Sequence, residues 1–276
     1  MSLANATRSE STKLLTTAMW WILGLILLVY VALTATGIGF VFSASAAGEL
    51  PGGSSGGHIP TAGLPALLYS LASSIGYVFP LLIGTLMVTA EFRHQTLTPT
   101  FLATPRRGQV LTAKALVGIV IGVAYAIVAL VAAVGPGAGF LAGFGQDAEL
   151  GSSDTWAMFG RIVIAFVLWV LIGLGVGALV RNQVAAVVVV LAFTQFVEPI
   201  GRVAAAFVKN LDKVMQFLPG AASDALVGSS IYTTMGAQSG SASAQLDWWA
   251  GGLVLLAYAV VLLILGYATS WRRDVE

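Results

Sequence analysis

Long apolar runs alternate with short polar stretches along the whole chain. A helix needs about 20 apolar residues to cross the roughly 30 Å hydrocarbon core of a bilayer. Six runs predict membrane-spanning helices, at about residues 18–42, 64–89, 110–134, 161–180, 184–198 and 248–270. The fifth is the shortest, because Glu198-Pro199 interrupts it. We therefore expect an all-α integral membrane protein with one transmembrane domain over residues 1–276.

The polar stretches between the runs predict loops and bends. Ser43–Gly63, Gly135–Trp156 and Ser229–Gln245 are rich in Gly, Ser or acidic residues, a composition typical of loops. Within the second run, Pro80 predicts a kink, which a membrane helix tolerates when neighbouring helices satisfy the freed carbonyl group.

Two further segments predict surface helices. Ile200–Leu218 has apolar residues at the i, i+3, i+4 and i+7 spacing and charges on its other face, which predicts an amphipathic helix in the interface. Pro219-Gly220 ends it, and Ala221–Gly228 would return, so that residues 199–228 form a re-entrant region. Met1–Thr17 favours an interfacial helix leading into the membrane, with a frayed terminus as the alternative.

Composition excludes several classes of protein and site. Hydrophobic residues make up 58% of the chain and charged residues 9%, whereas soluble domains are about half apolar and a quarter charged. Cysteine is absent and histidine occurs twice, so we expect no disulfide framework and no metal site. The chain has no G-x-x-x-x-G-K phosphate loop and no hydrolase motif, so we expect no catalytic residue and no cofactor in it. Gly173, Gly175 and Gly177 favour close helix packing over a dinucleotide loop.

The distribution of charge predicts the topology. Six spans place both ends of the chain on one side, and nine of the 13 basic residues fall there. Eight of the 12 acidic residues fall on the other side. Because cytoplasmic loops carry the excess of Lys and Arg, this pattern places both termini and the segment Glu91–Lys114 in the cytoplasm, and the Gly/Ser/acid-rich loops outside.

The polar segment Glu91–Lys114 carries five charged residues between two apolar runs. Placing one charge at mid-bilayer costs roughly 2.5–3.5 kcal/mol, so five would cost roughly 12 kcal/mol or more. The segment therefore lies in water or among headgroups. Thr98-Pro99 has the form of a helix start, and Pro105 ends the short helix that would follow. A short, stiff helix between two spans suits a surface that another protein grips.

The same segment contains a recognisable motif: Glu91-Phe92-Arg93-His94-Gln95-Thr96-Leu97, then Ala103-Thr104-Pro105-Arg106-Arg107, then Ala113-Lys114. It resembles the permease subunits of type-two ABC exporters, particularly those of actinobacteria, which carry E-[FY]-R-x-x-T-[IL] followed by A-T-P and a basic pair. Glu10–Thr17 is similar to the family's N-terminal helix, Gly177–Asn182 to its turn between spans four and five, and Leu218–Ala221 to its extracellular re-entrant pair. Ala18 departs from the family, in which a basic residue often precedes the first span.

The resemblance implies a cytoplasmic coupling helix between spans two and three, within residues 91–107, that docks on a separate ATP-binding subunit. The coupling residues would be Glu91, Phe92, Arg93, His94, Thr96, Leu97, Phe101, Leu102, Arg106 and Arg107. It further implies two permease copies, as a homodimer, and two ATPases that bind the ATP and Mg²⁺, in a bacterial plasma membrane. The exported compound would be hydrophobic or amphipathic: a drug, as in multidrug export, a lipid or a peptide antibiotic.

Five residues are candidates for the transport pathway or its gate: Tyr77, Phe79, Phe193, Phe196 and Glu198. Alternatively, these aromatic side chains pack or face lipid, and Glu198 caps a helix that begins at Pro199. Two other functions stay open. One is a membrane scaffold or anchor that recruits a cytoplasmic partner. The other is a secondary transporter, which the lack of ionisable residues in most spans disfavours.

Overall fold

The structure, a computed structural model, describes residues 2–49, 63–96, 99–100, 107–205, 208, 211–230 and 246–271. In these ranges all regular elements are helical, which confirms the all-α prediction. The elements are α1 Leu3–Thr16, α2 Met19–Ala47, α3 Leu64–Ser74, α4 Val78–Arg93, α6 Arg107–Gly143, α7 Ser153–Leu179, α8 Gln183–Ala192, the π-helix η1 Phe193–Val197, α9 Glu198–Ala205, α10 Asp212–Met215, α11 Pro219–Val227, α13 Trp248–Gly266 and the π-helix η2 Tyr267–Trp271.

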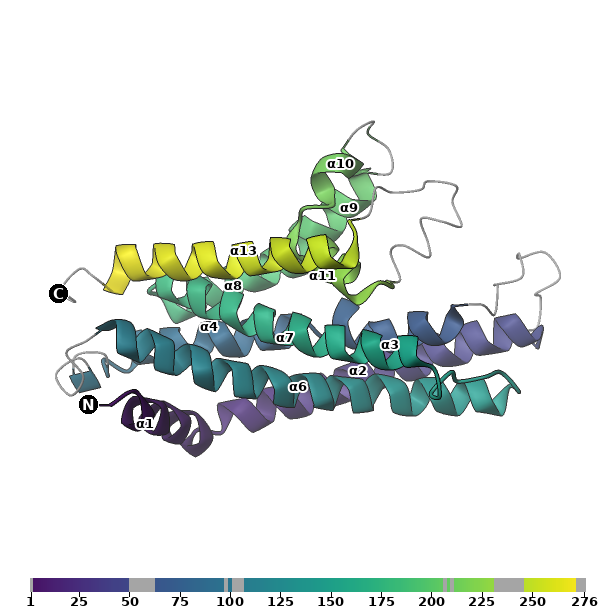
Figure 1. Cartoon of the computed structure of the whole chain (residues 1–276), viewed down its shortest axis with the longest axis horizontal. Helices are drawn as coiled ribbons and strands as arrows, with labels where there is room; N and C mark the ends of the chain where they lie inside the picture. Colours follow the sequence, from purple (N-terminus) through teal and green to yellow (C-terminus); the bar gives the residue numbers. More distant parts are fainter. Residues whose placement is uncertain are drawn as a thin grey trace.

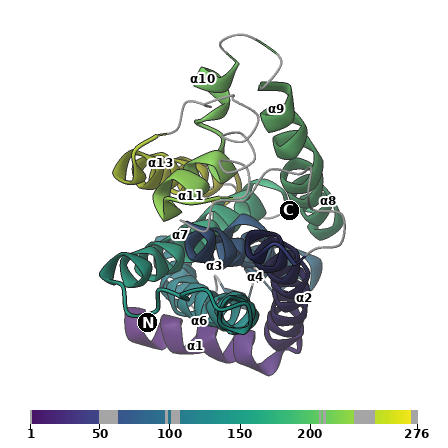
Figure 2. The ribbon, with the colours of Figure 1, turned by 90° about the vertical axis from the view of Figure 1, so that its right-hand side faces the viewer.

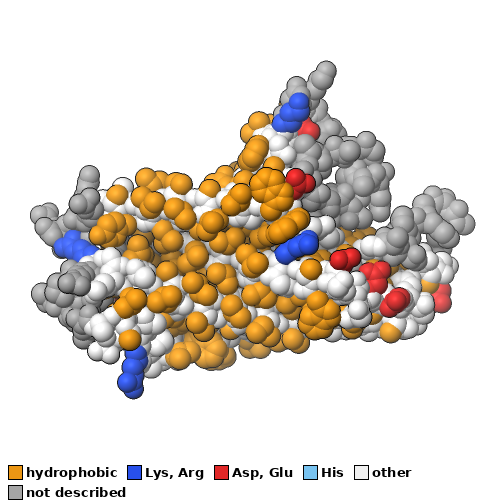
Figure 3. All heavy atoms as spheres, viewed as in Figure 1, with side chains coloured by type: hydrophobic (Ala, Val, Ile, Leu, Met, Phe, Trp, Pro, Cys, Tyr) orange, Lys and Arg blue, Asp and Glu red, His pale blue; other side chains and the backbone are white. Residues whose placement is uncertain are grey.

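Six helical stretches in the described part of the chain are long and apolar enough to cross a membrane, as the sequence predicts. Apart from α9 at the end of the fifth stretch, they run lengthwise through the bundle, and α1 and η2 lie at the same end of it (Figure 1). Apolar side chains cover the middle of the face in Figure 3, and acidic side chains gather toward the end opposite the termini. The longest helix, α6, has 37 residues and rises about 55 Å, well beyond the hydrocarbon core.

Helix α7 lies at the centre of the bundle and packs against α4, α6 and α13. Its glycines allow the backbones to approach closely. A methyl group added to Gly173 would meet the carbonyl oxygen of Leu81, and one added to Gly84 of α4 would meet that of Val170. This confirms close helix packing as the role of Gly173.

The predicted loops are shorter than composition indicates. The prediction of a loop over Gly135–Trp156 is wrong for its first part, because α6 continues through Pro136 to Gly143. Packing explains the difference: Phe140 contacts Phe40 of α2 in an edge-to-face arrangement, and Gly137 lies against Tyr69 of α3. Similarly, α2 extends to Ala47, into the predicted loop Ser43–Gly63.

Proline affects the second and fifth spans differently. Pro80 has no N–H to donate to the carbonyl of Gly76, and the helix is interrupted there, between α3 and α4. This confirms the predicted kink. The prediction that Glu198-Pro199 interrupts the fifth span is wrong. The helix continues from α8 into α9 through the π turn η1, in which the N–H of Glu198 bonds the carbonyl of Phe193. The wider turn accommodates the missing N–H of Pro199.

The prediction of one amphipathic helix over Ile200–Leu218 is also wrong. Helix α9 ends at Ala205, and α10 is a separate turn of four residues. Both stand away from the bundle, on the side opposite α1 (Figures 1 and 2). A periodic apolar pattern alone does not fix the length of a helix, because packing decides how far it continues. Helix α11, in contrast, is buried against α13, α7 and α3.

Candidate functional sites in two buried ionic clusters

Helix α1 brings the first set of charges to the bundle. Its N-cap, Ser2, accepts a hydrogen bond from the backbone N–H of Asn5, and Ala6, Glu10 and Leu14 are buried at four-residue spacing. This face packs against α6. The alternative of a frayed terminus is therefore wrong. The helix places the carboxylate of Glu10 beside the C-terminal end of α4.

The N-terminal cluster consists of Glu10 and Lys13 of α1, Glu91 of α4 and Lys114 of α6. The Lys13 Nζ lies 2.7 Å from Glu10 Oε1 and 2.8 Å from Glu91 Oε1. The Lys114 Nζ lies 2.5 Å from Glu10 Oε2 and 3.1 Å from Glu91 Oε1, and donates to the carbonyl of Met87. Lys114 is 2% exposed, and both glutamates are buried. Two carboxylates and two ammonium groups make this cluster neutral.

The neighbouring charges control protonation in this cluster. Burial by itself would raise the pKa of the Glu10 carboxyl, but the charge of Lys114 and the hydrogen bonds from both lysines outweigh it and hold that pKa below its usual value. Burial would lower the pKa of Lys13, but the charge of Glu91 and the hydrogen bonds to Glu10 and Glu91 raise it above its usual value. Both groups therefore stay charged near pH 7.

The cluster also holds the start of the polar segment. The Lys13 Nζ donates to Thr100 Oγ1 at 3.1 Å, and the hydroxyl of Thr100 donates to the carbonyl of Thr96. The N–H of Thr96 in turn donates to the carbonyl of Glu91. A continuous set of hydrogen bonds thus joins α1 to the segment that follows α4.

The predicted coupling residues have different surroundings. Glu91 lies inside the cluster, and Phe92 packs against the hydrophobic core. Arg93, His94 and Thr96 are exposed, and Arg93 has a long contact of 3.4 Å with Gln183 of α8. Arg107, half-buried, begins α6. The remaining predicted residues lie outside the described residues: Leu97, Phe101, Leu102 and Arg106.

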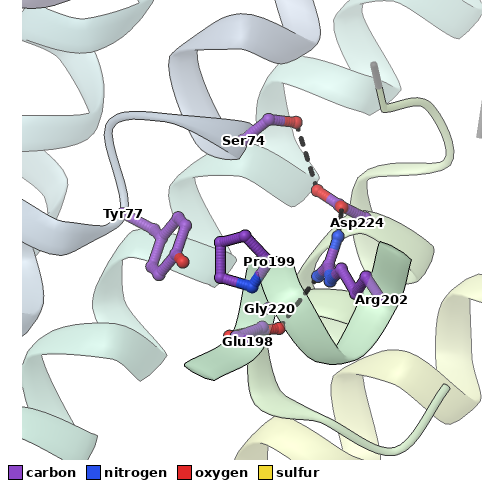
Figure 4. A pocket seen from close by; sticks show the side chains of 7 residues that line it. All are labelled: Ser74, Tyr77, Glu198, Pro199, Arg202, Gly220 and Asp224. Atoms are coloured by element: carbon purple, nitrogen blue, oxygen red, sulfur yellow. Dashed lines mark hydrogen bonds and ion pairs between the residues drawn. The ribbon is translucent and has the colours of Figure 1, made fainter. Parts of the chain in front are cut away.

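A second cluster, the fifth-span cluster, consists of Glu198 and Arg202 of α9 and Asp224 of α11. The Arg202 Nη1 donates to Asp224 Oδ2 at 2.6 Å, and its Nη2 donates to Glu198 Oε1 at 2.9 Å (Figure 4). Ser74 of α3 and Ser230 also donate to Asp224, at 3.1 and 2.8 Å. The cluster therefore joins the end of the fifth span to α11 and α3.

More polar contacts extend from this cluster into the bundle. Ser223, next to Asp224, accepts a hydrogen bond from the indole N–H of Trp169 in α7. Tyr77, between α3 and α4, donates its hydroxyl to the carbonyl of Thr194 in η1, and its ring lies 4.7 Å from that of Trp169. The break before Pro80 thus places a tyrosine where it bonds the π turn of the fifth span.

A small cavity lies beside the fifth-span cluster. Its volume is about 10 Å³, close to the space that one water molecule needs. Its lining consists of Ser74, Tyr77, Glu198, Pro199, Arg202, Gly220 and Asp224 (Figure 4). Among the described residues, Glu198 Oε2 is buried and has no hydrogen-bond partner. Since Glu198 lies within a continuous helix and is 1% exposed, the alternative that it caps a helix at the interface is wrong.

The other candidate pathway residues do not line this cavity. Phe79 is buried, with its ring 5.9 Å from that of Tyr30 in α2. Phe193 is partly buried, whereas Phe196 is 65% exposed on the outer face of the fifth span. Only Tyr77 and Glu198 of the five are brought together. The described residues also contain no group of three His, Asp or Glu side chains that could hold a metal ion.

Sequence reasoning missed the partners in both clusters. Arg202 belongs to the polar face predicted for Ile200–Leu218, although a charge four residues from Glu198 is the spacing of a helical ion pair. No sequence pattern points to Asp224. Glu10 and Lys114 are 104 positions apart, and no local pattern pairs them.

Comparison with known proteins supplies the family context for these sites. The family model described as ABC-2 family transporter protein matches residues 4–275, nearly the whole chain. No curated protein matches the sequence.

Proposed function

The chain belongs to the ABC-2 transporter family, and from this premise we propose that it is the membrane-spanning subunit of an exporter. It is a multi-pass membrane protein and the transport component of an ABC transporter. In the proposal it moves a hydrophobic or amphipathic compound outward, using ATP hydrolysed by a separate subunit. The cargo class is a drug, a lipid or a peptide antibiotic, since a largely uncharged interior does not suit a strongly ionic solute.

The N-terminal cluster is the observation that supports this proposal most. Three buried charges, those of Glu10, Glu91 and Lys114, and the half-buried Lys13 join α1, α4 and α6 at the point where the polar segment begins. Thr100 is tied to the same cluster through Lys13. A protein that gripped the segment would therefore pull on three helices together, as rigid-body coupling between subunits requires.

The energy source in the proposal is a pair of ATP-binding subunits that hold ATP and Mg²⁺, since the sequence has no phosphate loop. Two copies of this chain, as a homodimer, would form the pathway between them. Both termini and the coupling helix at residues 91–107 would face the cytoplasm of a bacterial cell, as the excess of basic residues on that side favours.

Arg93→Ala tests the coupling. Arg93 is exposed and its contact with Gln183 is long, so the variant should insert and unfold as the wild type does. Removing a charge-assisted contact of about 1.5–3 kcal/mol should lower ATP-driven transport about tenfold or more. The measurement is ATP-dependent uptake of a fluorescent amphipathic dye, or of a fluorescent phospholipid, by inverted membrane vesicles containing the chain with its copurified ATPase.

Arg181→Ala is the matched control, because Arg181 is an exposed basic residue in the turn before α8 and outside the proposed coupling helix. It should leave uptake unchanged. Equal uptake in the Arg93 variant and the wild type would contradict the role of this segment. A partner that copurifies without ATP-driven uptake would favour a scaffold, and uptake driven by an ion gradient without ATP would favour a secondary transporter.

A further inference from the structure

The fifth-span cluster is buried but its charges do not balance. Glu198 and Asp224 are 1% and 5% exposed, and both bond the guanidinium of Arg202. If both carboxyl groups were ionised, the three side chains would carry a net charge of −1. An uncompensated charge in a buried site costs several kcal/mol, and such a group takes up a proton instead.

Other charged or titratable groups on the neighbouring described elements bond or stack with other partners, or lie on α10, where Asp212 is half-buried. Arg161 of α7 lies over the ring of Trp248 at 5.0 Å, and Tyr258 of α13 donates to the carbonyl of Phe217. Tyr69 of α3 donates to the carbonyl of Ala148. On α10, the side chain of Lys213 is exposed. Among the residues that the structure describes, the charged groups that act on Glu198 are Arg202 and Asp224.

The hydrogen bonds indicate which carboxyl group holds the proton. Asp224 accepts from three side chains, those of Arg202, Ser74 and Ser230, and both of its oxygens are used. Neither oxygen of Asp224 is therefore left without a donor. Glu198 accepts from Arg202 and from the backbone N–H of Ala221, and both bonds reach the same oxygen, Oε1.

The two oxygens of Glu198 therefore differ as the two oxygens of a carboxylic acid differ. Oε1 has the place of the carbonyl oxygen, which accepts, and Oε2 has the place of the hydroxyl, which needs an acceptor. Gly220 leaves room for this group, because a methyl group added there would collide with the Glu198 carboxyl. We propose that Glu198 is a proton-binding site: Oε2 carries a proton at neutral pH and donates it to one water molecule in the adjoining cavity.

In this proposal one proton binds one carboxylate oxygen, and no other bond forms or breaks. The bound proton makes the fifth-span cluster neutral, as the N-terminal cluster already is. Tyr77, Ser74 and Arg202 also belong to the lining of this cavity (Figure 4), so the water would lie among polar side chains. The proposal concerns protonation alone and does not depend on the transport function.

Infrared spectroscopy tests it directly, because a protonated carboxyl group has a C=O stretching band that a carboxylate lacks. The full-length protein is purified in an alkyl maltoside, which has no carbonyl group, and measured at pH 7. The wild type should show one such band, Glu198→Gln should lose it, and Glu91→Gln, in the balanced cluster, should keep it. A wild type without the band, or a band that persists in Glu198→Gln, would overturn the proposal.

A second variant keeps the test independent of the folding of Glu198→Gln. In Asp224→Asn one negative charge is gone, so Glu198 and Arg202 balance each other and Glu198 should ionise. The band should therefore disappear although Glu198 is still present, and its persistence would overturn the charge argument. In D₂O the wild-type band should shift to lower frequency, and a band that does not shift would overturn the contact with water.

Discussion

The two buried clusters of this protein balance their charges in different ways. The N-terminal cluster pairs two carboxylates with two ammonium groups, so it is neutral with both carboxyl groups ionised. The fifth-span cluster sets two carboxyl groups against one guanidinium and is neutral only if one of them is protonated. Paired buried ions contribute little net stability, but removing one partner is costly. Removal of one charge should therefore lower the free energy of unfolding strongly in the N-terminal cluster. At Glu198 in the fifth-span cluster it should lower it only slightly.

The largest effect is expected from Lys114→Met. Lys114 is 2% exposed and bonds both glutamates of the N-terminal cluster. Its removal leaves two buried carboxylates with Lys13 alone, at a cost of about 3–5 kcal/mol in the free energy of unfolding. Thermal unfolding in detergent measures the change, with Arg181→Met as an exposed control. An unfolding temperature equal to that of the control would contradict the buried cluster.

The difference between Glu91→Gln and Glu198→Gln is the next largest. In the balanced cluster, the amide leaves two ammonium groups with the single carboxylate of Glu10, at a cost of about 1.5–3 kcal/mol. In the fifth-span cluster, the glutamine carbonyl accepts from Arg202 and Ala221 as before, and its NH₂ replaces the proposed hydroxyl, so the cost should stay within about 0.5–1 kcal/mol. The same unfolding assay compares them, and the reverse order would count against the asymmetry.

The smallest expected effect is on the pH dependence of stability in acid. The pKa of Glu10 is held below its usual value of 4.5, so its contribution to stability is present above that pH and is lost as the pH falls through the lowered pKa. The difference in unfolding temperature between wild type and Glu10→Gln should therefore be constant from pH 7 to about pH 5 and decrease below it. A difference that grows with acid would have the wrong sign for a paired carboxylate.

The sequence predicts the helices of this protein better than the contacts between them. Six spans follow from hydropathy, because the cost of placing polar groups in lipid is large and local. The extent of α6 past Pro136 and the continuity of the fifth span past Pro199 depend on contacts with α2 and α3 and on a π turn. The ion pairs depend on helices that meet far apart in sequence, such as α1 with α6. The motif at Glu91 marked a charged segment, but its cluster appears only once the helices are packed.

The π turn at Phe193–Val197 has a consequence for the direction in which the fifth span presents its side chains. One extra residue in a turn rotates everything beyond it by about 100° around the helix axis. After this turn Glu198 points into the protein, while Val197, Ile200 and Val203 point outward. The turn thus sets the azimuth of the helix end. In a regular α-helix, Glu198 and Arg202 would both point in another direction around the helix axis, away from Asp224 on α11.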